Sequence, residues 1–184
     1  MTVTAPKSLR LDVSVASVDV DADSVGMSNI RTASGDVRIG HVEGDIYVKS
    51  ASGDVKVEHA TGSARLSAAS GDCTIGSVGN DAQVTCASGD IRIGQIAGDA
   101  EFKTASGDVD VDCCRGERIS VKSASGDVAV GIPKGSKVAA DLFSLSGSLN
   151  LPEPSGEGGS GEGQRVRMRV RSMSGDITIN AVES

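Results

Sequence analysis

Aromatic residues are almost missing from this chain, whose 184 residues include two phenylalanines, one tyrosine and no tryptophan. Any core must therefore be narrow and aliphatic. Positive charge is also in deficit, because 18 basic residues face 25 acidic ones and leave a formal net charge of −7. This balance argues against a nucleic-acid-binding protein and against a protein that docks on anionic membranes.

Long apolar runs are absent as well. No stretch approaches the ~20 apolar residues that span a bilayer, and the N-terminal sequence lacks the continuous apolar segment of a secretion signal. We therefore expect no membrane insertion and a cytoplasmic location, or the cell surface if a leader has been removed.

The four cysteines have no C-x-x-C spacing, so the sequence indicates neither a zinc site nor a redox pair. By alignment of the repeats, Cys73, Cys86 and Cys114 fall at buried positions. Cys113 falls in a corner column with His41, and we expect its thiol to be exposed.

What the chain does have is a repeat, the tetrapeptide Ala-Ser-Gly-Asp. It begins at Ala33, Ala51, Ala69, Ala87, Ala105 and Ala124, at intervals of about eighteen residues. Each interval contains two short runs that alternate β-branched and polar residues, such as Val37-Arg38-Ile39, which is typical of half-buried strands. Two strands per interval predict an all-β parallel β-helix, or β-solenoid, whose coils stack at the strand spacing of ~4.8 Å.

The tetrapeptide is interpreted as the corner between strands, where glycine supplies a positive φ. We expect its alanine to point inward, and its serine and aspartate to form columns along the outside. A column of carboxylates is repulsive, and Arg38, Lys56 and Arg92 are placed to screen it. Calcium is an alternative counter-charge, because nine-residue half-repeats with Gly and Asp are similar to calcium-binding β-rolls. Its candidate ligands are Asp36, Asp54, Asp72, Asp90 and Asp108.

The repeat pattern predicts one β-solenoid domain over residues 1–184. Residues 9–32 are expected to form an irregular N-terminal capping coil, residues 33–137 the regular repeats, and residues 138–184 a C-terminal cap. Within this cap, residues 152–164 have the composition of a flexible acidic loop. An insertion carrying Leu142, Phe143 and Leu145 is expected to separate the strand near Val138 from the strand near Leu149.

Four arginines, Arg165, Arg167, Arg169 and Arg171, project from one face of a strand near the C-terminus. One hypothesis makes them an interaction stripe for an anion or a partner. The other makes them a charged terminal strand that prevents edge pairing and is neutralised by the acidic loop. No aromatic residues are interleaved with them to stack bases, which again disfavours nucleic acid.

No catalytic constellation stands out. No nucleophile, base and orienting group recur at a suitable spacing, and no phosphate-binding glycine loop precedes a helix. His41 and His59 occupy equivalent corners but lack a recurring third metal ligand. We predict a protein that is not an enzyme and has no cofactor.

The repeated Ser-Gly-Asp-Val-x-Val/Ile units from Ser34 to Val130 carry a family resemblance, together with the ending Val170-Arg171-Ser172-Met173-Ser174-Gly175-Asp176-Ile177. On these units the chain resembles a bacterial β-strand-repeat family of unknown function, common in actinobacteria, to which an adhesin role has been attributed. The resemblance implies a parallel β-helix-like fold and no catalytic residues.

The sequence supports three functional hypotheses. The first is a scaffold that binds another protein through a solenoid face or through its turn columns. The second is a structural protein whose molecules associate end to end as homo-oligomers, and the third is a calcium-stabilised roll.

Overall fold

The computed structural model describes residues 10–151 and 165–182, and these residues form strands, turns and no helix. It follows that none of them belongs to a helix long enough to cross a bilayer. The predicted acidic loop, residues 152–164, lies outside the described residues.

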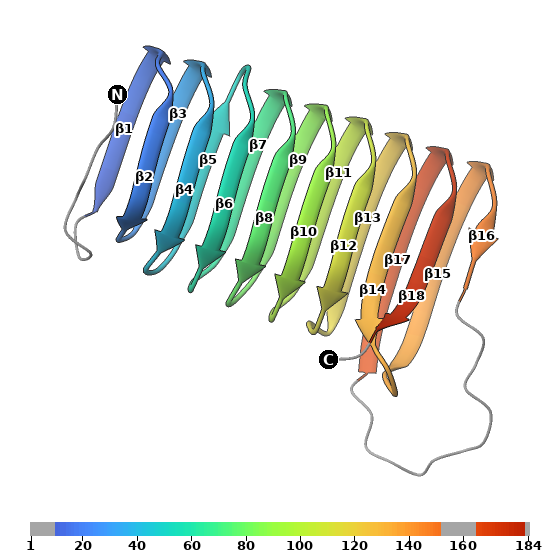
Figure 1. Ribbon diagram of the computed structural model, residues 1–184. Coiled ribbons are helices and arrows are strands. Elements are labelled where there is room, and N and C mark those ends of the chain that lie inside the picture. Colours follow the sequence, from blue (N-terminus) through green and yellow to red (C-terminus); the bar gives the residue numbers. More distant parts are fainter. Residues whose placement is uncertain (1–9, 152–164, 183–184) are drawn as a thin grey trace.

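The strands alternate between two parallel sheets of nine strands each, which we call the odd sheet and the even sheet (Figure 1). The odd sheet contains β1 (Leu11–Ser17), β3 (Ser28–Ser34), β5 (Ile46–Ser50), β7 (Ala64–Ser70), β9 (Ala82–Ser88), β11 (Ala100–Ser106), β13 (Arg118–Ser125), β15 (Lys137–Ser146) and β17 (Arg165–Ser174). The even sheet contains β2 (Val20–Val25), β4 (Val37–Val42), β6 (Val55–Ala60), β8 (Cys73–Val78), β10 (Ile91–Ile96), β12 (Val109–Cys114), β14 (Val128–Pro133), β16 (Leu149–Asn150) and β18 (Ile177–Val182).

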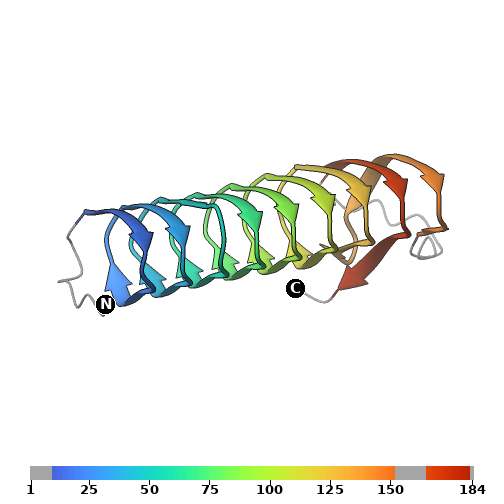
Figure 2. The same ribbon diagram turned by 90° about the horizontal axis from the view of Figure 1, so that it is seen from above.

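One odd and one even strand make a coil, and successive coils stack in register (Figure 2). Val37 pairs with Val55, and Ile91 pairs with Val109 one coil apart. All three of Val37, Val55 and Ile91 are at most 1 % exposed, so equivalent residues share one environment. The predicted all-β solenoid with coils of about eighteen residues is confirmed.

The core lies between the sheets and is aliphatic. Large inward residues of the even sheet, such as Ile39 and Ile75, face an odd sheet in which small residues such as Ala64 and Ala82 alternate with larger ones. Phe102 is fully buried. The interior is therefore filled layer by layer, and each layer depends only on its neighbours.

The corner glycines are required by close stacking as well as by conformation. Gly89 has a φ of +124°, and a Cβ built on it would overlap the carbonyl oxygen of Gly71 in the preceding coil. The same relation holds at the equivalent corner glycines, including Gly175. Any side chain at these positions would push two coils apart.

The expectation that the tetrapeptide alanine points inward is wrong. Ala51, like its equivalents, is exposed, and the residue before it, Ser50, is 4 % exposed instead. The Ser50 hydroxyl donates to the Ser52 carbonyl oxygen at 3.0 Å. Thr32, Thr104, Ser123 and Ser172 make the same bond two residues ahead. The alternation of inward and outward side chains therefore continues through Ser50 to Ala51, and the buried Ser50 hydroxyl closes the corner.

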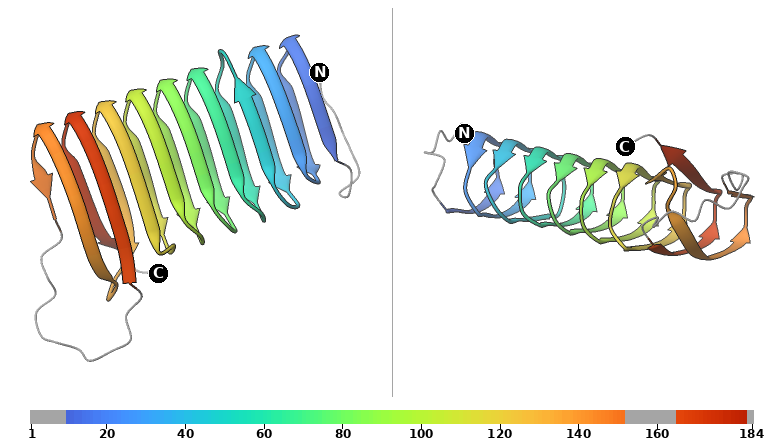
Figure 3. Two further views of the ribbon diagram at one scale, coloured as in Figure 1. Left: turned by 180° about the vertical axis from the view of Figure 1, so that it is seen from behind. Right: turned by 90° about the horizontal axis from the view of Figure 1, so that it is seen from below.

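The order of the last coils differs from the order in the sequence. The coil of β17 and β18 lies between the β13–β14 coil and the β15–β16 coil, so β15 is the edge of the odd sheet (Figure 3). The arginines are thus on an internal strand, and the interpretation of a terminal strand that blocks edge pairing is wrong. The expected insertion is also wrong, since Leu142, Phe143 and Leu145 continue the single strand β15.

The corner residues explain this inverted order. Each internal coil needs an aspartate whose side chain accepts a backbone N–H from the next coil. Asp176 donates its N–H to Asp127 Oδ1 at 2.8 Å and accepts the Ser148 N–H at 2.7 Å. The β15–β16 corner has Ser148 where the other corners have aspartate, so this coil can donate but offers no carboxylate to a further coil. It is therefore suited to the end of the stack.

Candidate functional site

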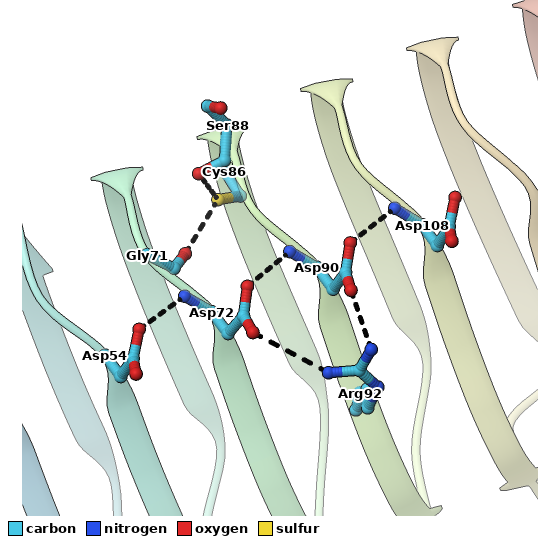
Figure 4. Close-up of polar contacts among 8 residues, drawn as sticks. All are labelled: Asp54, Gly71, Asp72, Cys86, Ser88, Asp90, Arg92 and Asp108. Carbon is cyan, nitrogen blue, oxygen red and sulfur yellow. Dashed lines mark hydrogen bonds and ion pairs between the residues drawn. The ribbon is translucent and has the colours of Figure 1, made fainter.

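The aspartate columns form a continuous hydrogen-bond ladder at the corner that leads from the odd to the even sheet. We call it the aspartate ladder, and it consists of Asp19, Asp36, Asp54, Asp72, Asp90, Asp108, Asp127 and Asp176. In each case Oδ1 accepts the backbone N–H of the equivalent residue in the next coil. In Figure 4, Asp72 Oδ1 accepts from Asp90 at 2.9 Å, and Asp90 accepts from Asp108 at 3.0 Å.

Two arginines reduce repulsion within the ladder. Arg92 contacts Asp90 at 2.7 Å and Asp72 at 3.7 Å, and Arg38 contacts Asp36 at 2.8 Å. These contacts confirm two of the three screening residues expected from the sequence. Lys56 forms no ion pair with the carboxylates that the structure describes.

The calcium candidates of the sequence analysis are all members of this ladder. Their Oδ1 atoms are already occupied by backbone N–H donors, which leaves each carboxylate only one oxygen for a cation. In the part of the chain that the structure describes, no three His, Cys, Asp or Glu side chains gather closely enough to hold a metal ion. Calcium coordination needs six to eight oxygens, and the ladder provides too few at any one point.

Adding calcium should therefore leave the melting temperature unchanged relative to a sample in chelator. A ligand that binds the folded state raises the transition by mass action, so a thermal melt measured with EDTA and with millimolar CaCl₂ checks this directly. Magnesium at the same ionic strength is the control. A rise of several degrees that is specific to calcium would contradict the assignment of these aspartates to backbone bonding.

The histidine pair is part of a shallow depression on the even sheet. The rings of His41 and His59 lie 6.3 Å apart between centroids, and His59 Nδ1 is hydrogen-bonded to Ser77 Oγ at 2.8 Å. The depression has a volume of about 430 Å³. Ser77 thus completes a small polar cluster, and no described side chain adds a third metal ligand.

All four cysteines are free and buried, which confirms three expectations and corrects the fourth. Cys113 is 7 % exposed. The strand β14 lies close to β12 here, since a Cβ on Gly131 would overlap the Asp112 carbonyl oxygen. Burial raises the pKa of Cys114 to about 11, which keeps it protonated. Cys86 acts as a corner residue, because its Sγ donates to the carbonyl oxygens of Ser88 and Gly71 (Figure 4).

A groove with a volume of about 800 Å³ runs along the outward face of the odd sheet. The exposed tetrapeptide alanines from Ala33 to Ala105 line it, together with Lys49 and Lys103. Lys103 contacts Glu101 at 2.7 Å, and this hydrogen bond lowers the pKa of Glu101. The cation at this point of the groove is therefore paired.

The C-terminal part of the same face carries cations that are not paired. The placement of β17 between β13 and β15 sets Arg167 opposite Arg118, Arg171 opposite Lys122, and Arg165 opposite Lys137. We call these six residues the cationic patch. All six are exposed, and none forms an ion pair with a carboxylate in residues 10–151 or 165–182. Of the four stripe arginines, only Arg169 has such a partner, Asp141 at 3.2 Å.

The sequence suggested the stripe but missed the other half of the patch. Arg118 and Lys122 are far from the stripe in the chain, and they lie opposite Arg167 and Arg171 only because the last two coils exchange places. Lys137 lies on β15, which would neighbour β17 in either order. Ser148 in place of aspartate was the available signal for that exchange.

A family model described as Toastrack DUF4097 matches the chain over residues 1–83 and again over residues 68–180. The two matches overlap and together cover nearly the whole solenoid. They fit the resemblance to a β-strand-repeat family of unknown function. No curated protein and no solved structure matches the chain.

Proposed function

The chain belongs to the Toastrack DUF4097 family, and from this premise we propose that it is a non-enzymatic scaffold whose cationic patch binds an acidic segment of another protein. The rigid stack of coils presents the patch, and the partner supplies the missing negative charge. An adhesive role is the special case in which that partner lies on another cell.

The observation that carries this proposal is that three of the four outward arginines of β17 each lie opposite a cation of a neighbouring strand. Cations directly opposite each other on neighbouring strands destabilise a sheet, because the side chains lie only about one strand spacing apart. A protein of net charge −7 has carboxylates enough to avoid such pairs. Concentrated unpaired charge of one sign is instead typical of surfaces that steer and select an oppositely charged partner.

Apolar residues beside the patch favour a protein over other polyanions. Phe143, Leu145 and Met173 are 52 %, 65 % and 59 % exposed and lie on β15 and β17. Phe143 is opposite Arg171. Arginine, methionine and aromatic residues together are characteristic of protein interfaces. Alternate residues of β17 are ~6.7 Å apart, which is also the spacing of alternate side chains in an extended peptide.

The test uses a fluorescent peptide with alternating glutamate and serine, and the same peptide with lysine in place of glutamate. We expect fluorescence anisotropy to show binding of the glutamate peptide only, weakening as salt is added. The double variant R167E/R171E should weaken that binding by at least about tenfold. Both side chains are exposed, so the fold should be retained.

The matched control is K56E/R65E, which makes the same change in net charge at exposed residues outside the patch. This control should bind the peptide with little change. Equal weakening in both variants would mean that only overall charge matters, and would contradict the proposal. Tighter binding of a single-stranded oligonucleotide of equal charge would show that the partner is a nucleic acid and not a protein.

A further inference from the structure

The C-terminal end of the solenoid is an open edge in both sheets. β15 and β16 are the last strands of the odd and even sheets, and no described strand pairs with their outer sides. β15 is ten residues long, which makes it one of the two longest strands. Long uncovered edges with free N–H and C=O groups readily pair with another chain.

The inner surface at this end is apolar and uncovered. Val138 and Leu149 are 36 % and 48 % exposed, whereas their equivalents one coil inward, Val166 and Ile177, are both 0 % exposed. Leu151, beyond β16, is 58 % exposed. The end coil thus shows core residues that a further layer would bury.

The neighbouring segment of the chain cannot supply that layer. Residues 152–164, PEPSGEGGSGEGQ, contain no aliphatic or aromatic side chain apart from two prolines. Burying an apolar surface requires apolar side chains, and this segment does not have them.

The opposite end of the solenoid differs at its corner. Val18 holds the position equivalent to Gly35, whose ideal Cβ would lie 2.6 Å from the Val18 carbonyl oxygen. A coil stacked before β1 with the same geometry would bring its own corner carbonyl against the Val18 side chain. Val18 therefore disfavours continuation of the stack at this end, and with it the head-to-tail polymer considered from the sequence.

We propose that two copies of this chain associate through their C-terminal ends, with β15 of each copy pairing antiparallel to β15 of the other. The two-fold axis is perpendicular to the planes of the sheets, so the odd sheets of the two copies become continuous with each other. The same rotation brings the open edge of one even sheet to that of the other. With Ala139 at the axis, Lys137 of each copy lies opposite Asp141 of the second copy, so the edge is complementary to itself. Such an isologous contact stops at the dimer.

Sedimentation velocity over a concentration series tests this proposal. The wild-type chain should form monomers and dimers but nothing larger. Ala140 is an exposed residue of β15 on the inward side, so A140E places two carboxylates in the contact. We expect A140E to weaken the dimer at least about tenfold. The matched control A105E changes an exposed alanine in the middle of the solenoid and should remain dimeric.

The variant V18E establishes which end is used, and it should leave the dimer intact. Dissociation by V18E, wild-type assemblies larger than dimers, or a wild type that stays monomeric throughout would each overturn the proposal. So would an A140E dimer as stable as the wild type. Circular dichroism spectra and melts of each variant separate loss of the contact from loss of the fold. These variants change no residue of the cationic patch, although one of its members, Lys137, lies in the proposed contact. Loss of the dimer in A140E and loss of peptide binding in R167E/R171E therefore distinguish the two proposals.

Discussion

Gly89→Ala is expected to lower the free energy of unfolding by about 3 to 5 kcal/mol, because backbone strain and a steric overlap act together. The φ of +124° disfavours any L side chain, and the new Cβ would overlap the Gly71 carbonyl oxygen. The strain alone is worth about 1 to 3 kcal/mol. The overlap adds a similar amount, since both sides of the contact are backbone and cannot turn away. Urea unfolding followed by circular dichroism measures the sum.

Gly135→Ala is the matched control for this substitution. Gly135 also has a positive φ, +83°, but a Cβ there would meet no atom within 4 Å. It should cost only the conformational penalty of about 1 to 2 kcal/mol. The difference between the two variants is the stacking contact between coils. Equal losses at Gly89 and Gly135 would contradict the close approach of successive corners.

The sequence predicted the solenoid because every repeat carries the same structural signals. A period of about eighteen residues, alternation within each half, and a glycine at each corner all point to stacked parallel strands. The register of Val37 with Val55 follows directly from that repetition. In a solenoid each coil meets only its neighbours, so local signals are sufficient for most of the chain.

One error recurs at every regular corner, and the others occurred where the repeat changes. Whether the Ala51 side chain points inward or outward depends on whether the alternation of the strand continues through Ser50. A corner motif does not determine that. Cys113 is buried although its equivalents His59 and Gln95 are exposed, and it lies next to the corner between Cys114 and Ile119, where the coil gains one residue. The place of β17 depends on a long-range pairing between coils that are not consecutive in the chain. Alternation within β17 carries no information on which strand lies beside it.

That last pairing is also what creates the proposed binding surface. Had the coils stacked in chain order, β15 would lie beside β13, and β17 would be the edge strand. Arg167 would then not face Arg118, and the unpaired cations would be distributed over a larger area of the sheet. Similarly, the apolar end would be different, because Ile177 and not Leu149 would belong to the last coil. The cationic patch and the open end therefore share one structural origin, the Ser148 corner, and can still be altered separately.

Asp72→Ala is expected to destabilise the protein by about 1 to 2 kcal/mol, through loss of an acceptor from the middle of the aspartate ladder. The Asp90 N–H would lose its partner at 2.9 Å, and Arg92 would keep only its contact with Asp90. Hydrogen bonds to charged groups contribute about 1.5 to 3 kcal/mol when buried, and the value is reduced here because the Asp72 side chain is 46 % exposed. Urea unfolding gives the loss.

Asp72→Asn separates the hydrogen bond from the charge. Its Oδ1 can still accept the Asp90 N–H, so most of the stability should return, with a residual loss below about 1 kcal/mol because neutral hydrogen bonds are weaker than charge-assisted ones. If the ladder instead served to bind a cation, the asparagine variant would lose as much as the alanine variant, and only when that cation was present. A loss shared equally by both variants in EDTA would show that Asp72 acts through its charge and not through the bond between coils. The comparison thus decides whether the aspartates of the repeat hold the coils together or are kept for a ligand.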